Sequence, residues 1–144
     1  MLKKNEEYVV EIIDNGFQGE GIAKIEGMAV FIPNAIKGEK AKIKILKVTS
    51  KIAYGKIIGI LEKSDDRIEC VDCETFSKCG GCVLRHVKYE KTLEMKKESV
   101  ETTLRKTLGR EIKVSDVLKM DDPYNYRNKV QYPVGMDTNG KAVM

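Results

Sequence analysis

Five short apolar runs, each bounded by glycine or a turn sequence, fill residues 6–61 and constrain the fold more than any other feature. The runs are YVVEII (8–13), GIAKI (21–25), MAVFIP (28–33), KAKIKILKV (40–48) and IAYGKIIGIL (52–61). The turn Asp14-Asn15-Gly16 and the recurring Gly19, Gly21, Gly27 and Gly38 supply residues that tolerate positive φ. The pattern predicts five strands, and a small OB-like β-barrel fits best because closure leaves no unpaired sheet edge.

A row of lysines lies within and between the fourth and fifth runs. Apolar and basic residues alternate from Ala41 to Ile45, so the isoleucines are predicted to face the core and the lysines the outside. No acid occurs between Lys40 and Lys56, which favours a polyanionic partner such as RNA, although a solvated lysine face is the alternative. The candidate RNA-binding lysines are Lys40, Lys42, Lys44, Lys47, Lys51 and Lys56.

Two further groups of residues are candidate RNA contacts. Phe17, Phe31 and Tyr54 lie in or beside the predicted barrel and could stack on bases, but an aromatic at a strand position is more often part of a core. Arg127 and Lys129 place two cations beside an aromatic and an amide, which suits RNA, although polar residues at the start of a strand are an equal alternative.

Cys70, Cys73, Cys79 and Cys82 are spaced C-x2-C-x5-C-x2-C, with Gly80-Gly81 inside the second pair. The start of the chain lacks the apolar stretch of a secretory signal, so a cytoplasmic location with reduced thiols is predicted. Thiolates are soft ligands, and the segment has almost nothing to build a core from, so a metal site is predicted. An iron-sulfur cluster is favoured over zinc because structural zinc usually separates its two cysteine pairs further. Reduced cysteines that bind no metal are the third alternative.

The rest of the chain predicts one helix and two more strands. An apolar stripe from Tyr89 to Leu108 ends at Gly109, which is typical of one amphipathic helix. Residues 83–110 also carry more basic than acidic side chains, while 112–118 and 129–134 are predicted strands. His86 is the only histidine, so no histidine-based catalytic set is expected, and a structural or surface role is favoured over metal ligation.

These residues together resemble the RNA uridine-5-methyltransferases of the RlmD type (RumA/TrmA-like), which methylate carbon 5 of uridine in 23S ribosomal RNA. The segment 16–45 looks like a TRAM domain, an RNA-binding barrel; CETFSKCGGC with its following helix looks like the iron-sulfur motif; DPYNYRNKVQYPVG looks like the entry to the central domain. The resemblance implies three parts: a TRAM barrel at 1–61, a cysteine cluster loop and helix at 62–110, and a truncated central RNA-binding domain with an incomplete α+β fold at 111–144.

The resemblance also implies a [4Fe-4S] cluster held by Cys73, Cys79 and Cys82 and by a fourth cysteine that lies beyond Met144. Cys70 is additional to the family spacing, and whether it is a ligand stays open. The family's S-adenosylmethionine domain is not in the 144 residues. The chain alone is therefore expected to bind RNA, which the resemblance implies is ribosomal RNA, but not to methylate it. The alternatives are a free-standing RNA-binding module with a structural metal site, iron-sulfur or zinc, and a zinc-stabilised adaptor for protein partners.

Overall fold

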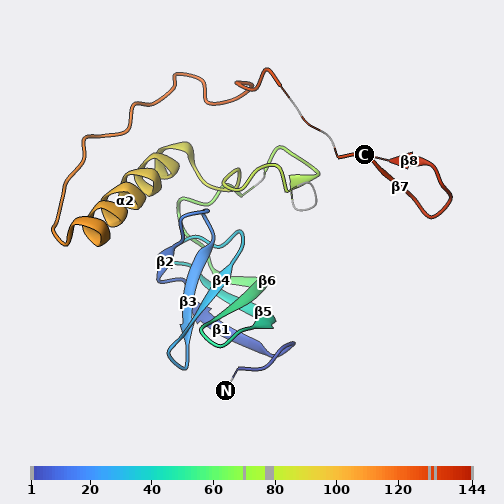
Figure 1. Ribbon diagram of the computed structural model, residues 1–144, viewed down its shortest axis with the longest axis horizontal. Coiled ribbons are helices and arrows are strands. Elements are labelled where there is room, and N and C mark those ends of the chain that lie inside the picture. Colours follow the sequence, from blue (N-terminus) through green and yellow to red (C-terminus); the bar gives the residue numbers. More distant parts are fainter. Residues whose placement is uncertain (1, 70, 77–79, 130, 132, 144) are drawn as a thin grey trace.

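The computed structural model describes residues 2–69, 71–76, 80–129, 131 and 133–143. It has a β-barrel formed by the first sixty residues, a cysteine-bearing segment above it, one long helix, and an extended C-terminal stretch (Figure 1). Among the described residues, no helix is both long and apolar enough to cross a membrane.

The five predicted runs all form strands, and a short additional strand joins them. The strands are β1 (Glu7–Glu11), β2 (Asp14–Asn15), β3 (Gly21–Ile25), β4 (Met28–Ile32), β5 (Lys40–Val48) and β6 (Ile52–Glu62). They form one sheet in the order β1-β5-β6-β4-β3-β2, in which β4 and β6 are parallel. The expectation of five strands is thus corrected to six, because Asp14 and Asn15, expected in a turn, pair with Ile22 and Gly21.

The same stretch of chain pairs with both ends of the sheet. Strand β1 pairs with β5, in the register Glu7 opposite Lys44. Two residues beyond β1 the partner changes: the Ile12 N–H donates to the Glu39 carbonyl at 2.8 Å, and the Ile13 N–H donates to the Ile22 carbonyl at 2.9 Å. Because β1 and β2 are continuous, these bonds close the sheet into a barrel and leave no long unpaired edge.

The barrel interior is aliphatic. The alternation predicted for β5 is confirmed, because Ala41, Ile43 and Ile45 are fully buried while Lys42 is exposed. The buried residues that pack together are Leu2, Val10, Ile12, Ala23, Val30, Ile32, Ala35, Ala41, Ile43, Ile45 and Ala53.

The predicted helix is confirmed as α2 (Tyr89–Leu108). It ends at Gly109, whose φ of 66° is the left-handed conformation that glycine adopts without strain, and the Gly109 N–H donates to the Arg105 carbonyl. Its apolar stripe is not a buried face: Val100 is 50% exposed and Leu108 is 52% exposed.

The residues after α2 differ from the sequence prediction. Residues 112–118, and those of 129–134 that the structure describes, form no strand, and the short strands β7 (Gly135–Met136) and β8 (Ala142–Val143) pair further on. Residues 112–120 run beside α2 instead, where the Met120 N–H donates to the Tyr89 hydroxyl and the Lys97 ammonium pairs with Asp116 at 2.7 Å. A helix satisfies its backbone groups internally, so α2 gives this segment no strand partner.

Replacement of Gly21 tests the closure of the barrel. A Cβ at this position would lie 2.5 Å from the Ala35 Cβ and 2.9 Å from the Ile12 Cγ2, and both neighbours are buried. We therefore expect Gly21→Ala to lower the free energy of unfolding by about 1–3 kcal/mol in urea denaturation. The control is Gly59→Ala, whose Cβ would meet nothing within 4 Å, and an equal loss in both variants would contradict the packing argument.

Candidate nucleic-acid interface and cysteine segment

The outer face of strands β5 and β6, here called the lysine face, carries lysines directly opposite one another. Lys44 on β5 pairs in register with Lys56 on β6, and Lys47 pairs in register with Tyr54. Like charges in directly opposed positions of an antiparallel pair repel each other, which destabilises the isolated sheet. A polyanion bound across this face would remove that repulsion.

Two of the predicted lysines differ from the rest, because acids from other strands lie beside them. The Lys42 ammonium lies 2.7 Å from a Glu7 carboxylate oxygen, and that hydrogen bond and charge hold the pKa of Glu7 below its usual value. The Lys40 ammonium lies 3.3 Å from Glu62. Within the described residues no ion pair forms at Lys44, Lys47, Lys51 or Lys56. The surface of lysines without ion pairs therefore includes fewer of the six predicted lysines than the absence of acids between Lys40 and Lys56 suggests.

The aromatic side chains of the barrel lie at its surface. Phe31 and Tyr54 are register partners on β4 and β6, and their ring centroids are 6.0 Å apart. Tyr54 is 41% exposed, and Phe17, in the loop before β3, is 87% exposed. The core alternative is thus excluded for Tyr54 and Phe17, because both side chains are exposed and neither belongs to the core cluster.

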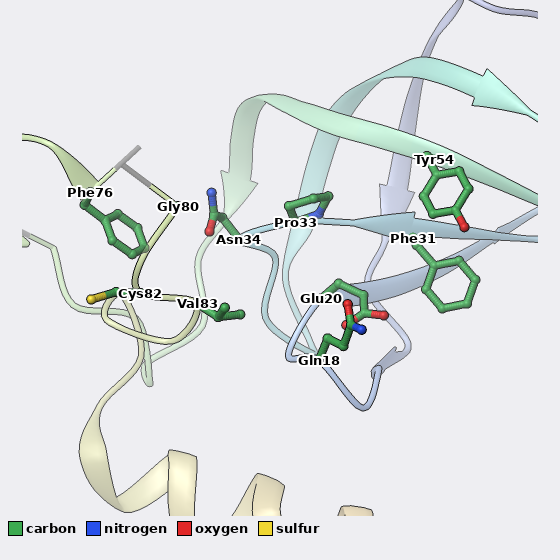
Figure 2. Close-up of a pocket in the computed structure, with 10 residues that line it drawn as sticks. All are labelled: Gln18, Glu20, Phe31, Pro33, Asn34, Tyr54, Phe76, Gly80, Cys82 and Val83. Carbon is green, nitrogen blue, oxygen red and sulfur yellow. The ribbon is translucent and has the colours of Figure 1, made fainter. Parts of the chain in front are cut away.

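A cavity of about 380 Å³ opens between this aromatic pair and the part of the chain between β6 and α2, here called the cysteine segment (Figure 2). Its barrel wall consists of Gln18, Glu20, Phe31, Pro33, Asn34 and Tyr54. Its opposite wall consists of Phe76, Gly80, Cys82 and Val83. We call this cavity the interdomain groove; its walls come from segments more than twenty residues apart, so the sequence pattern did not predict it.

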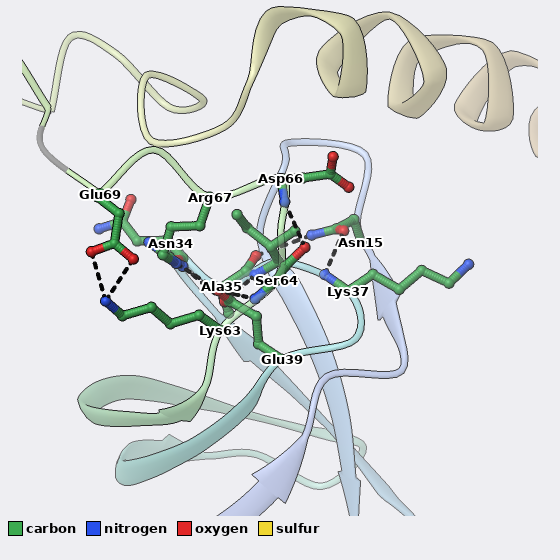
Figure 3. Close-up of polar contacts among 11 residues, drawn as sticks. Asn15, Asn34, Ala35, Lys37, Glu39, Lys63, Ser64, Asp66, Arg67 and Glu69 are labelled. Atoms are coloured by element: carbon green, nitrogen blue, oxygen red, sulfur yellow. Dashed lines mark hydrogen bonds and ion pairs between the residues drawn. The ribbon is translucent and has the colours of Figure 1, made fainter.

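A buried ion pair holds the cysteine segment onto the barrel (Figure 3). The Glu39 side chain is fully buried and accepts two hydrogen bonds from the Arg67 guanidinium, at 2.5 and 2.8 Å. It also accepts from the Ile36 N–H at 2.9 Å, while Arg67 donates to the Asn34 carbonyl at 2.7 Å. Burial raises the pKa of the Glu39 carboxyl, but these hydrogen bonds and the arginine charge outweigh it and leave the pKa below its usual value.

The two ends of the cysteine segment are tied together above this ion pair. The Ile68 N–H donates to the His86 carbonyl, and the Lys88 N–H donates to the Asp66 carbonyl, both at 2.9 Å. Arg67 and Val87 form an antiparallel bridge between them. Residues 66–68 and 86–88 therefore hold the two ends of the cysteine segment side by side, and α2 begins immediately after this closure.

Cys73 and Cys82 are the two cysteines of the motif within the described residues, and both are free thiols. Hydrogen bonds from Thr75, together with the positive charge of Arg85, lower the pKa of the Cys73 thiol. Arg85 is itself fixed by two hydrogen bonds of 2.8 Å to Asp72. This environment favours the thiolate form of Cys73, which is the form that binds iron or zinc.

The other two predicted ligands, Cys70 and Cys79, lie outside the described residues. Among the residues that are described, no group of three histidine, cysteine or acidic side chains could hold a metal ion. The choice of metal and the role of Cys70 stay predictions.

His86 lies inside the molecule rather than at its surface. It is 2% exposed, its ring lies 5.7 Å from that of Phe76, and neither ring nitrogen has a hydrogen-bond partner among the described residues. Burial, with the nearby positive charge of Arg67, lowers its pKa to about 4. His86 is therefore neutral at physiological pH, and the surface role considered from sequence is excluded.

Arg127 lies against the cysteine segment and not on the lysine face. Its guanidinium approaches the Gly81 carbonyl at 3.5 Å, and the ring of the nearby Tyr124 lies under the Arg85 guanidinium at 5.6 Å. Lys129 is exposed and makes no ion pair within the described part of the chain. The structure thus divides the predicted RNA-contact residues between two surfaces.

The basic excess of residues 83–110 is partly neutralised in the fold. Lys91 pairs with Glu94 at 2.8 Å, and Arg105 pairs with Glu111 at 3.4 Å. With the pairs already described for Arg85 and Lys97, half of the basic side chains in this segment have an acidic partner. The helix is therefore a weaker candidate for phosphate binding than the barrel.

The buried neutral His86 predicts a pH dependence of stability. Its pKa falls from 6.5 to about 4 on folding, so the unfolded chain takes up the proton first as the pH falls. We expect the free energy of unfolding to decrease by about 2 kcal/mol between pH 7.5 and pH 5. His86→Phe should remove most of this decrease, because the chain has no other histidine; an unchanged pH profile in the variant would contradict the assignment.

Comparisons with known proteins agree with this architecture. The TRAM domain profile matches residues 2–58. A protein of Clostridium acetobutylicum named an uncharacterized RNA methyltransferase is 48% identical over 98% of this chain and 31% of its own length. Proteins of the same name from Clostridium tetani and Listeria monocytogenes are each 40% identical, over 94% and 98% of this chain and 29% and 31% of their own lengths.

A solution structure of a conserved protein from Methanococcus maripaludis is 40% identical, covers 40% of this chain and 81% of that one, and superposes with a TM-score of 0.38. The chain spans about a third of the length of the curated relatives it matches. The TRAM profile and the named relatives confirm the coarser part of the resemblance drawn from the sequence, which is a TRAM domain in a chain related to RNA methyltransferases. The chain therefore carries a TRAM domain at residues 2–58 and is homologous over nearly its whole length to proteins named RNA methyltransferases.

Proposed function

We propose that the 144 residues are the RNA-binding portion of an S-adenosylmethionine-dependent RNA uridine-5-methyltransferase that acts on 23S ribosomal RNA in the cytoplasm. The observation that carries the proposal is the outer face of β5 and β6, where Lys47 and Lys56, which form no ion pair within the described residues, lie beside the exposed Tyr54. Lys44 adds a third cation to this face, opposite Lys56 on β6 and opposite Glu7 on β1. Cations that contact phosphates next to aromatic rings that stack on bases are the usual means of holding single-stranded RNA.

The proposal assigns binding and catalysis to different parts of the protein. The relatives named RNA methyltransferases are about three times as long as the matched region, which leaves room for a catalytic domain outside it. We therefore expect methyl transfer to depend on residues outside these 144 and the chain alone to bind RNA without modifying it.

The cysteine segment has a structural role in this proposal. Cys73, Cys79 and Cys82, with Cys70 or a further cysteine, would hold a [4Fe-4S] cluster, and zinc is the alternative. When bound, the cluster supplies a cross-link that orders the loop. The loop has few apolar residues, and its thiolate-favouring Cys73 and its tied base would position the ligands before the metal binds.

Charge removal on the lysine face tests the RNA-binding proposal. We expect the triple variant Lys44→Gln, Lys47→Gln, Lys56→Gln to weaken the binding of a labelled single-stranded 23S fragment at least tenfold. Fluorescence anisotropy across a salt series should also give a shallower slope of log affinity against log salt, by about two for three lost contacts.

The matched control removes the same charge from lysines that have acidic partners. Lys37, Lys40 and Lys63 pair with Asp14, Glu62 and Glu69 at 3.7, 3.3 and 2.8 Å. Changing these three to glutamine should leave the salt slope nearly unchanged. If both triple variants weaken binding equally, the lysine face is only part of a general positive charge and the proposed interface is wrong.

Metal analysis of anaerobically purified protein tests the proposed cofactor. We expect iron and inorganic sulfide in comparable amounts, with the broad visible absorbance of a cluster, and a lower melting temperature after the iron is removed. Cys73→Ser and Cys82→Ser should lose the iron, because each removes a proposed ligand. Zinc without sulfide would overturn the iron-sulfur assignment, and an unchanged melting temperature would overturn the structural role.

A further inference from the structure

We propose that the interdomain groove binds one unpaired RNA base, which stacks against Tyr54 and Phe31 while the flanking phosphates lie along the lysine face. This inference rests on the proposed RNA binding and adds a site at which a base, rather than the backbone, is held. Figure 2 shows the two rings on the barrel side of the groove and Phe76 on the other side.

The size and openness of the groove suit one flat ring. Its volume of about 380 Å³ lies in the range of small-molecule sites, and it is formed by two parts of the chain that are already held together by the Glu39–Arg67 pair. The Gly19 backbone, at a φ of 86°, lies directly against Leu84, which also fixes the barrel loop to the cysteine segment. These two contacts hold the described walls of the groove together without a bound nucleotide.

The aromatic residues give the groove stacking surfaces on both sides. Tyr54 is 41% exposed on the outer face of β6, and its neighbour Phe31 lies 6.0 Å away between centroids, so the pair presents a continuous apolar surface. Phe76 on the opposite wall is held by its contact with the buried His86 ring. Stacking between a base and such rings is favourable whatever the base identity.

The polar residues in the wall favour a base over a phosphate. Gln18 and Asn34 bring side-chain amides, which can both donate to and accept from the edge of a base. Glu20 adds a carboxylate to the same wall. A carboxylate repels phosphate, whereas the N–H groups of a base can donate to it, so the negative backbone is directed away from the groove.

The lysines lie where the backbone of such a nucleotide would run. Lys47 is the register partner of Tyr54, and Lys56 lies two residues further along β6 on the same face. Neither lysine forms an ion pair within the described part of the chain. The arrangement therefore places cations beside the stacking rings and the carboxylate among the residues that would surround the base.

Two RNA probes of equal charge separate base binding from phosphate binding. The first is a uridine nonamer, and the second is a nonamer of stable abasic spacers with the same number of phosphates. We expect the 144-residue chain, purified anaerobically, to bind the uridine probe about tenfold more tightly than the abasic probe. Tyr54→Ala should abolish this difference by weakening the uridine probe alone, whereas Tyr54→Phe should preserve it.

Two further variants keep the test independent of barrel stability. Phe76→Ala changes the wall outside the barrel and should reduce the difference between the probes in the same way. Phe17→Ala is the matched aromatic control, because Phe17 is 87% exposed and does not line the groove, so it should leave the difference unchanged.

The possible failures of the two proposals are distinguishable. If the chain binds neither probe, the proposed RNA binding is wrong. If it binds both probes equally and with the same salt slope, RNA binding stands and the base site is wrong. An equal loss in Phe17→Ala and Tyr54→Ala would also overturn the groove assignment, because it would show that any surface aromatic has the same effect.

Discussion

The buried ion pair between Glu39 and Arg67 is the interaction on which the arrangement of the molecule depends. A fully buried carboxylate is tolerated only when its lone pairs are occupied, and the two hydrogen bonds from Arg67 with those from the Ile36 and Ser64 N–H groups meet that need. Glu39 immediately precedes β5, whereas Arg67 lies near the start of the cysteine segment. The pair thus converts two consecutive pieces of chain into one body, and both walls of the interdomain groove depend on it.

Periodicity predicted the elements whose partners are set by their own pattern. The alternating Ala41, Ile43 and Ile45 could form only a half-buried strand, and the stripe ending at Gly109 could form only a helix. Periodicity gave a wrong prediction at 112–118, because this apolar stretch lies beside helix α2 and has no neighbouring strand with which to pair. It also gave no sign of β2, because a two-residue strand has no period.

The candidate site was predicted less completely than the barrel, for a physical reason. The lysines were identified by their type, but Glu7 and Glu62, which neutralise two of them, arrive from other strands through register that the sequence does not show. Glu39 and Arg67 are separated by 28 residues, and nothing in their spacing connects them. Contacts of this kind follow from the closed barrel and become visible only once its strand order is known.

Barrel closure through β1 and β2 also has a consequence for the order of events during synthesis. The first strand leaves the ribosome early, but its partner β5 begins only at Lys40, so β1 stays unpaired while more than twenty further residues are added. The β3–β4 hairpin, whose partners are adjacent in sequence, can form in the meantime. At translation speeds of roughly 5–20 residues per second, this exposes an apolar strand to the cell for a second or more. The acids at its two ends, Glu7 and Glu11, would then act as protection against association with other nascent chains.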